Sequence, residues 1–171
     1  LDRCAANFNQ GMALLVSHLR NSGCNRLGIA STRSHLSWTS YEKPAGLLRA
    51  WYIGDCDFHL VQPFIADGRS MGVEALATWM RLHKVDGVMT DDPGLALKAI
   101  KRLGPSSSGS IRVAGWELSH DSPYSGIVTP DARVAEAAVE RLRSKLLSRD
   151  WGVPEVRTMV SIDCEWCTGG Q

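Results

Sequence analysis

Short apolar segments alternate with longer amphipathic segments along most of this 171-residue chain. The apolar segments are each followed by polar residues, and they lie at 26–30, 58–61, 86–90 and 111–115. Between them, apolar residues recur at helical spacing, as Val73, Leu76, Ala77 and Met80 do within 70–83. Strands that alternate with helices in this way form a mainly parallel sheet that helices cover on both faces. The sequence therefore predicts an α/β fold with a parallel sheet flanked by helices.

The ends of several predicted helices carry their own signals. Asp92 precedes Pro93, which places a carboxylate at the N-cap and a proline at the first helical position. A first helix is predicted at about 10–22, and the longest helix at 131–149. A last strand is predicted at 158–162, after which the chain reaches a pair of cysteines.

Polar and aromatic residues follow the predicted strands, and in open parallel sheets ligands bind beyond these carboxyl ends. The residues in question are Ser31, Thr32 and Arg33, then Gln62, then Asp91 and Asp92, and finally Trp116 and Glu117. No glycine-rich loop follows any of the strands, so this edge suits a polyhydroxylated ligand better than a phosphate. We expect no cofactor.

The composition excludes several classes of function. The formal net charge is only +1, and the chain has no basic stripe that would favour direct contact with nucleic acid. No apolar stretch approaches the roughly 18 residues that a membrane span requires. The odd number of cysteines, five in all, is typical of a reducing compartment rather than of a disulfide framework. We therefore expect a cytoplasmic protein with no membrane partner.

The segment Cys164-Glu165-Trp166-Cys167 has the spacing of a dithiol redox site or of half a zinc site. A redox cysteine requires a helix N-terminus to lower its pKa, but this pair follows a predicted strand and the sequence ends four residues later. A structural zinc site requires four ligands, and no second pair of this kind is present. We interpret the pair as incidental residues at a strand end and predict no metal site.

The order of these segments resembles the LacI/GalR family. Segment 11–31 (GMALLVSHLRNSGCNRLGIAS) is similar to its helix, glycine and strand, and segment 85–104 (VDGVMTDDPGLALKAIKRLG) to its strand, acidic pair and helix. Segment 111–119 (IRVAGWELS) resembles its next strand, and 126–148 its threonine, loop and long helix. The tail from 152 to 170 falls where the family has its last strand.

The resemblance implies a particular architecture. Family members are bacterial transcription regulators whose effector domain has two periplasmic-binding-protein-like lobes of type I, with a small ligand between them. Residues 1–171 would form a partial effector-binding domain, with 23–112 plus 156–163 as the second lobe. Residues 1–22 and 116–150 would contain helices that normally belong to the first lobe. Because most of that lobe is missing, we expect these helices to be covered by dimerisation, by segment exchange or by packing back on the chain.

The resemblance also suggests the ligand-binding residues. The family's Arg-x-x-Gly matches the segment from Lys43 to Gly46, so a lysine ammonium group stands where the family has the planar guanidinium group of an arginine. The family's aspartate after the third strand matches Asp92, or Asp91 if the register shifts by one. Its aromatic–Asp pair matches Trp116 and Glu117, with the indole as a stacking face. The predicted ligand-binding set, with no catalytic or metal residue, is Arg33, Lys43, Asp92, Trp116 and Glu117.

The sequence thus predicts a non-enzymatic effector-binding core for a small, carbohydrate-like molecule. By the resemblance it would act as a homodimer and would reach DNA only through a missing N-terminal helix-turn-helix domain. One alternative is a transport-type sugar-binding protein of similar fold. A second is a small α/β enzyme that uses Asp91, Asp92 or Glu117 as acid–base groups. His35 and His120 are interpreted as surface or ligand contacts rather than catalytic groups.

Overall fold

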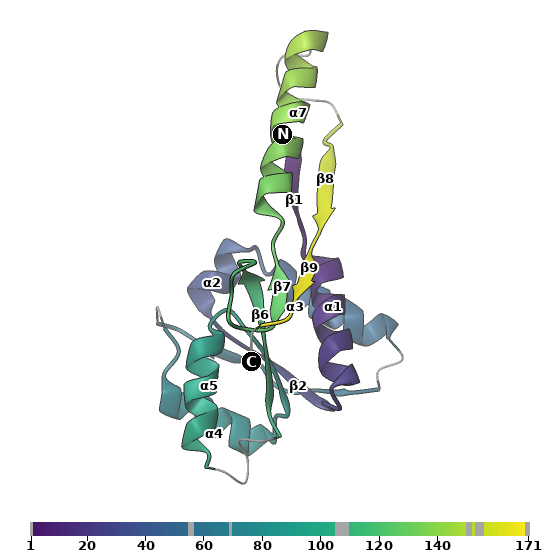
Figure 1. The fold of residues 1–171 in the computed structure, drawn as a ribbon. Helices are drawn as coiled ribbons and strands as arrows, with labels where there is room; N and C mark the ends of the chain where they lie inside the picture. Colours follow the sequence, from purple (N-terminus) through teal and green to yellow (C-terminus); the bar gives the residue numbers. More distant parts are fainter. Residues whose placement is uncertain are drawn as a thin grey trace.

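A mainly parallel sheet forms the centre of the main body, as the computed structural model shows for residues 2–54, 57–68, 70–104, 110–149, 152 and 156–169 (Figure 1). Its strand order is β3–β2–β5–β6–β7–β9, with β4 also paired to β2. Only the β7–β9 pair is antiparallel. The strands are β2 (Arg26–Thr32), β3 (His59–Leu60), β4 (Phe64–Ala66), β5 (Gly87–Thr90), β6 (Arg112–Leu118), β7 (Gly126–Val128) and β9 (Glu165–Cys167). The predicted α/β fold with a parallel, helix-flanked sheet is confirmed.

Two apolar clusters lie on opposite faces of this sheet. Alternate strand residues point to opposite faces, so Val88 of β5 joins one cluster and Met89 the other. The Met89 cluster is covered by α1 (Phe8–Asn21) and α3 (Glu42–Ile53), and the Val88 cluster by α4 (Val73–His83) and α5 (Pro93–Arg102). The short helix α2 (Arg33–Trp38) directly follows β2. Within the described part of the chain, no helix combines the length and apolar character of a membrane span.

Three elements form an arm that projects away from the main body (Figure 1). Strand β1 (Arg3–Asn7) pairs in parallel with β8 (Met159–Asp163), and α7 (Asp131–Ser148) packs against both strands. Asp2 joins the elements, because its carboxylate accepts hydrogen bonds from the backbone N–H of Thr158 at 3.1 Å and from Nε of Arg141 at 2.8 Å. These bonds lower the pKa of Asp2 to about 2.

The body and the arm divide the chain differently from the predicted lobes. Helix α1, expected with the first lobe in 1–22, lies in the body because its apolar face is buried against the sheet and α3. The end of β6 and strand β7, expected there within 116–150, belong to the main sheet. Strand β8, expected in the second lobe within 156–163, pairs with β1 in the arm. Of the two helices expected to require cover, α7 alone has no buried residue, and Leu142 and Leu147 are among its exposed side chains.

Candidate functional site

Five side chains meet at the carboxyl ends of β2, β5 and β6. His35 lies on α2, Lys43 lies in the first turn of α3, Asp91 directly follows β5, and Trp116 and Glu117 lie in β6. We call these five residues the polar cluster. They come together because the carboxyl ends of parallel strands share one edge of the sheet.

Lys43 is the most deeply buried charged residue of the polar cluster. Its side chain is 0% exposed, and its Nζ lies 2.6 Å from Oε1 of Glu117 and 4.7 Å from the ring centroid of Phe8. Burial lowers the pKa of Lys43, and Glu117 opposes this shift. Burial acts in the opposite sense on Glu117, but hydrogen bonds from His35 and Lys43 overcome it and lower the pKa of this carboxyl. The two groups therefore form an internally neutralised ion pair.

A backbone irregularity places Glu117 in this position. The pairing of β6 with β7 shifts register between Gly115 and Leu118, and Glu117 has a φ of +59°. Such bulges turn a side chain away from the direction that regular alternation would give it. A non-glycine residue rarely adopts this left-handed conformation, and strain of this kind is common at binding sites.

One nitrogen of His35 is at the centre of the polar cluster. Nε2 lies 3.0 Å from Oε2 of Glu117, 3.1 Å from Nζ of Lys43 and 3.2 Å from Nε1 of Trp116. A protonated Nε2 donates to Glu117, whereas an unprotonated Nε2 accepts from the indole or the ammonium group. Nδ1 lies 3.7 Å from Oδ2 of Asp91. His35 can therefore exchange partners when its proton moves.

Two buried oxygens at this edge, Oγ of Ser31 and Oδ1 of Asp91, make no hydrogen bond of good geometry with the described residues. Burial raises the pKa of Asp91, and the nearby charge of His35 opposes the shift. An interaction with the Ser31 hydroxyl also acts to lower the pKa of the Asp91 carboxyl. Buried polar atoms are nearly always hydrogen-bonded in folded proteins. This edge of the sheet therefore keeps hydrogen-bonding capacity that water or a polar ligand can use.

The structure brings together three of the five predicted ligand-binding residues, namely Lys43, Trp116 and Glu117. Arg33 is turned away, with a half-exposed side chain whose Nε lies 2.7 Å from Oδ1 of Asp67. Asp92 serves as the predicted N-cap, since its carboxylate accepts from the backbone N–H of Leu95. The adjacent Asp91 faces the polar cluster instead.

Trp116 differs from expectation, and His35, expected as a surface or ligand contact, joins the polar cluster. The Trp116 side chain is buried, with a residue exposure of 1%, so it supplies an indole N–H but no open face for stacking. Residues 33–38, within a run rich in serine and threonine, form α2, and this helix brings His35 against Glu117 and Lys43. The sequence signal for that helix is Thr32, whose hydroxyl caps it by accepting from the backbone N–H of His35.

The cysteine pair lies apart from the polar cluster. Cys164 is buried between the arm and the body, and burial raises the pKa of its thiol to about 11. A raised pKa is the opposite of what a reactive thiol requires. The described residues contain no group of three or more His, Cys, Asp or Glu side chains arranged to hold a metal ion.

Comparison with solved structures finds the same fold in sugar-binding proteins and transcription regulators. The ribose operon repressor protein of Lactobacillus acidophilus is 13% identical, with a TM-score of 0.68 over 98% of this chain and 63% of that one. A periplasmic binding protein/LacI transcriptional regulator of Alkaliphilus metalliredigens, complexed with D-xylulofuranose, is 17% identical, with a TM-score of 0.64 over 94% and 62%. A periplasmic solute-binding protein of an ABC transporter from Actinobacillus succinogenes, with bound D-allose, is 14% identical, with a TM-score of 0.73 over 98% and 62%.

These similarities establish the fold, which is that of LacI-type regulators and periplasmic-binding-protein-like domains. The chain spans less than two thirds of the length of each of these three structures. No protein-family model and no curated protein matches the sequence. The structural neighbours named above are regulators and binding proteins, not enzymes.

Proposed function

We propose that this chain binds a small, uncharged, carbohydrate-like molecule at the polar cluster. The observation that carries the proposal is the neutralised Lys43–Glu117 pair beside the unpaired oxygens of Ser31 and Asp91. Phosphate and carboxylate ligands form their strongest hydrogen bonds with Arg or Lys side chains that are free to pair with them. The ammonium group of Lys43 already has its carboxylate, and Arg33 lies elsewhere. Carboxylate and hydroxyl oxygens that lack donors instead suit the hydroxyl groups of a sugar.

In this proposal Ser31 and the five residues of the polar cluster have separate roles. Asp91 and Glu117 accept hydrogen bonds from ligand hydroxyl groups, and Ser31 both donates and accepts. His35 donates or accepts according to which of its nitrogens is protonated. Lys43 and Trp116 are positioning residues, because both are buried and both contact His35.

We further propose that the ligand is an effector and that the chain is the effector-binding core of a LacI-type regulator. In a homodimer, a ligand that favours one orientation of the arm would pass this preference to a separate DNA-binding domain. The contact between Lys43 and Phe8 supports such coupling, because Phe8 is the first residue of α1 and directly follows β1 of the arm. A transport-type sugar-binding protein is a second candidate, favoured by the TM-score of 0.73 to the solute-binding protein.

Thermal unfolding with a panel of sugars tests the binding proposal. We expect at least one of D-ribose, D-allose and D-xylulose to raise the unfolding temperature of the 171-residue chain, and ribose 5-phosphate to have no effect. Asp91→Ala should remove this shift. Asp92→Ala is the matched control, since it removes a helix cap, lowers stability by about 1 kcal/mol and should leave the sugar shift intact. Retention of the shift in Asp91→Ala, or its absence with every sugar, would contradict the proposal.

The codons upstream of Leu1 separate the two candidate roles. About 60 codons of a helix-turn-helix domain followed by a first lobe would support the regulator. A signal peptide in that position would support the transport-type protein.

A further inference from the structure

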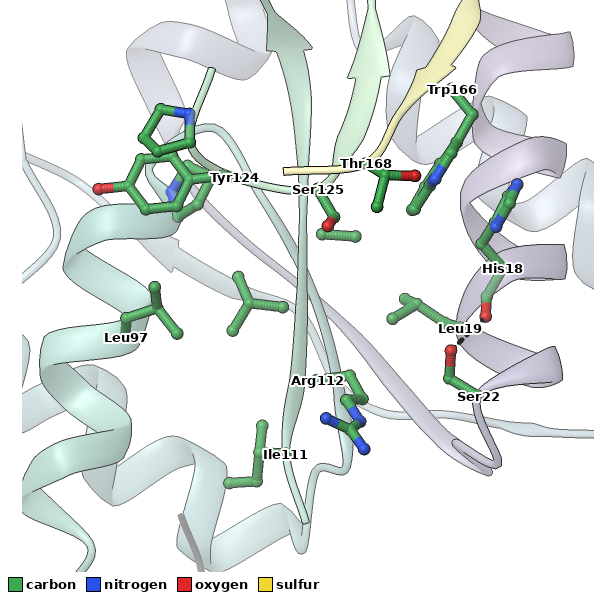
Figure 2. Close-up of a pocket in the computed structure, with 14 residues that line it drawn as sticks. His18, Leu19, Ser22, Leu97, Ile111, Arg112, Tyr124, Ser125, Trp166 and Thr168 are labelled. Carbon is green, nitrogen blue, oxygen red and sulfur yellow. Dashed lines mark hydrogen bonds between the residues drawn. The ribbon is translucent and has the colours of Figure 1, made fainter. Parts of the chain in front are cut away.

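A groove of about 730 Å³ runs along the open edge of β6, away from the polar cluster (Figure 2). Strand β5 pairs with β6 from Arg112 to Gly115, but β7 pairs with the opposite edge only from Gly115 onward. No strand of the described residues pairs with that edge between Arg112 and Ala114. Figure 2 shows this part of β6 in the middle of the groove, with α5 on one side and α1 on the other.

Hydrogen-bonding groups of the β6 backbone face into the groove. The N–H of Arg112 donates to the carbonyl of Asp86 on the β5 side at 2.8 Å, whereas the N–H of Gly115 donates to Ser125 on the opposite side at 2.9 Å. Successive residues of a parallel strand direct their N–H and C=O groups to alternate sides. Val113, two residues before Gly115, therefore presents its N–H and C=O groups to the groove.

The two walls of the groove differ in chemistry. Leu97 and Tyr124 lie on the α5 side, and Leu19 lies on the α1 side together with His18 and Trp166 (Figure 2). The rings of His18 and Trp166 are stacked, with centroids 3.7 Å apart and planes 4° apart. An extended segment placed along β6 would direct alternate side chains to these two walls.

The positive charge of Arg112 indicates which side chains a bound segment should carry. Arg112 is among the residues that line the groove (Figure 2), and the groove's described lining contains no carboxylate. No described carboxylate forms an ion pair with Arg112. An acidic side chain on the α1 side of the occupant would therefore complement the groove.

We propose that this groove binds an extended peptide segment of a partner protein, which adds to the sheet as a strand beside Ile111–Ala114. The segment has apolar residues that face Leu97 and an acidic residue that faces Arg112. Main-chain hydrogen bonds to Val113 supply affinity, and the two walls supply specificity. The four residues Ile111–Ala114 span about 13 Å of extended chain, and the position of this edge between α1 and α5 suits a single strand better than a second sheet. This site is separate from the polar cluster and does not depend on the sugar proposal.

Selection from a displayed library of random, cysteine-free nonapeptides on the 171-residue chain tests the proposal. We expect enrichment of peptides that alternate apolar residues and carry an acidic residue. Synthetic copies should bind at least about tenfold more weakly to Val113→Pro, which removes the groove-facing N–H and keeps the bonds to β5. Val113→Ala, which keeps the N–H, is the matched control. Arg112→Glu should weaken the same peptides, and Asp91→Ala should not affect them.

N-methylation of the peptide gives a second readout that does not require a variant to fold. Two peptides are compared, one methylated on the odd-numbered amides and one on the even-numbered amides. One pattern should abolish binding and the other should leave it unchanged, because only one set of amides faces β6. The proposal would be overturned if both methylation patterns weakened binding equally, or if no enriched peptide bound more weakly to Val113→Pro. If the chain self-associates and Arg112→Glu abolishes this self-association, the groove binds a second copy of the chain, and the proposal of a partner peptide is also overturned.

Discussion

Removal of the negative charge at Glu117 should destabilise the protein more than removal of the positive charge at Lys43. The ammonium group of Lys43 is fully buried, whereas the Glu117 side chain is 29% exposed and also contacts His35. In Glu117→Gln the ammonium group stays buried without its nearest counter-charge. In Lys43→Met the remaining carboxylate keeps His35 and access to water. The two single variants should therefore lower the free energy of unfolding by different amounts.

The expected magnitudes follow from this asymmetry. Breaking a fully buried ion pair costs about 3–5 kcal/mol. Glutamine keeps one acceptor near Lys43, and the charge of Asp91 also favours the ammonium form, so we expect about 2–3 kcal/mol for Glu117→Gln. Lys43→Met should cost about 1 kcal/mol, and the double variant should lie near that value. The coupling energy between the two sites then has a magnitude of about 2–3 kcal/mol.

Urea denaturation at pH 7, followed by tryptophan fluorescence, measures all four proteins of this cycle. For a chain of this length, the destabilisation of Glu117→Gln corresponds to a fall of about 5–10 °C in the unfolding temperature. Glu165→Gln is the control, because Glu165 forms an ion pair with Arg133 that is more than half exposed and should contribute less than about 1 kcal/mol. Strictly additive single effects, or a Glu117→Gln variant within about 0.5 kcal/mol of wild type, would refute the reasoning.

Three further predictions concern other parts of the molecule. Burial raises the pKa of Asp91 above its ordinary value of 3.8, so the folded protein keeps this proton at pH values where the unfolded chain has lost it. The free energy of unfolding of wild type relative to Asp91→Asn should therefore be greatest below pH 3.8 and fall as pH rises through the folded pKa. Parallel urea titrations from pH 3 to pH 8 measure this difference, and a pH-independent difference would contradict it. Gly28→Ala should destabilise by about 1–3 kcal/mol, because an added Cβ would lie 2.7 Å from the ring of Trp79 and from a methyl group of Val61; a thermal melt within 1 °C of wild type would count against this packing. The pKa of Asp2 is lowered to about 2, so its contribution to the arm is present above pH 3.8 and is lost as pH falls towards 2; amide exchange in β1 and β8 should be faster in Asp2→Asn at pH 6, while exchange in β5 is unchanged.

The regular part of the fold could be predicted from the sequence because each local signal agrees with the others. The apolar segment at 86–90 is short enough to be a buried strand, and Asp92-Pro93 shortly after it is typical of a helix start. The structure contains both features, β5 and α5. The assignment of α1 failed for a different reason. Helical periodicity shows that Met12, Leu15 and Leu19 share one face, but it does not show which sheet covers that face.

The candidate site was predictable to the extent that it is built at strand ends. Trp116 and Glu117 were selected because a parallel sheet gathers the residues after its strands at one edge. Lys43, which lies on α3, was selected only because it matches the family's Arg-x-x-Gly. His35 was expected as a surface or ligand contact but was left out of the predicted set, because a run of serine and threonine residues resembles a loop. Helix α2, which Thr32 caps, instead brings the histidine into the polar cluster. The exposure of Trp116 was misjudged because its place after an apolar strand does not reveal that α1 and α3 cover this end of the sheet.

The adjacent carboxylates Asp91 and Asp92 show why the site needs a structure. Both follow β5, and either could be a helix cap or a ligand-facing group by sequence alone. The backbone N–H of Asp92 donates to Oγ of Thr90, and its carboxylate accepts from Leu95. These two bonds commit Asp92 to beginning α5, and Asp91 is left beside His35 with one oxygen unpaired among the described residues. A shift of one residue in the start of α5 would exchange the two roles, so the position of the helix cap selects which carboxylate is available to a ligand.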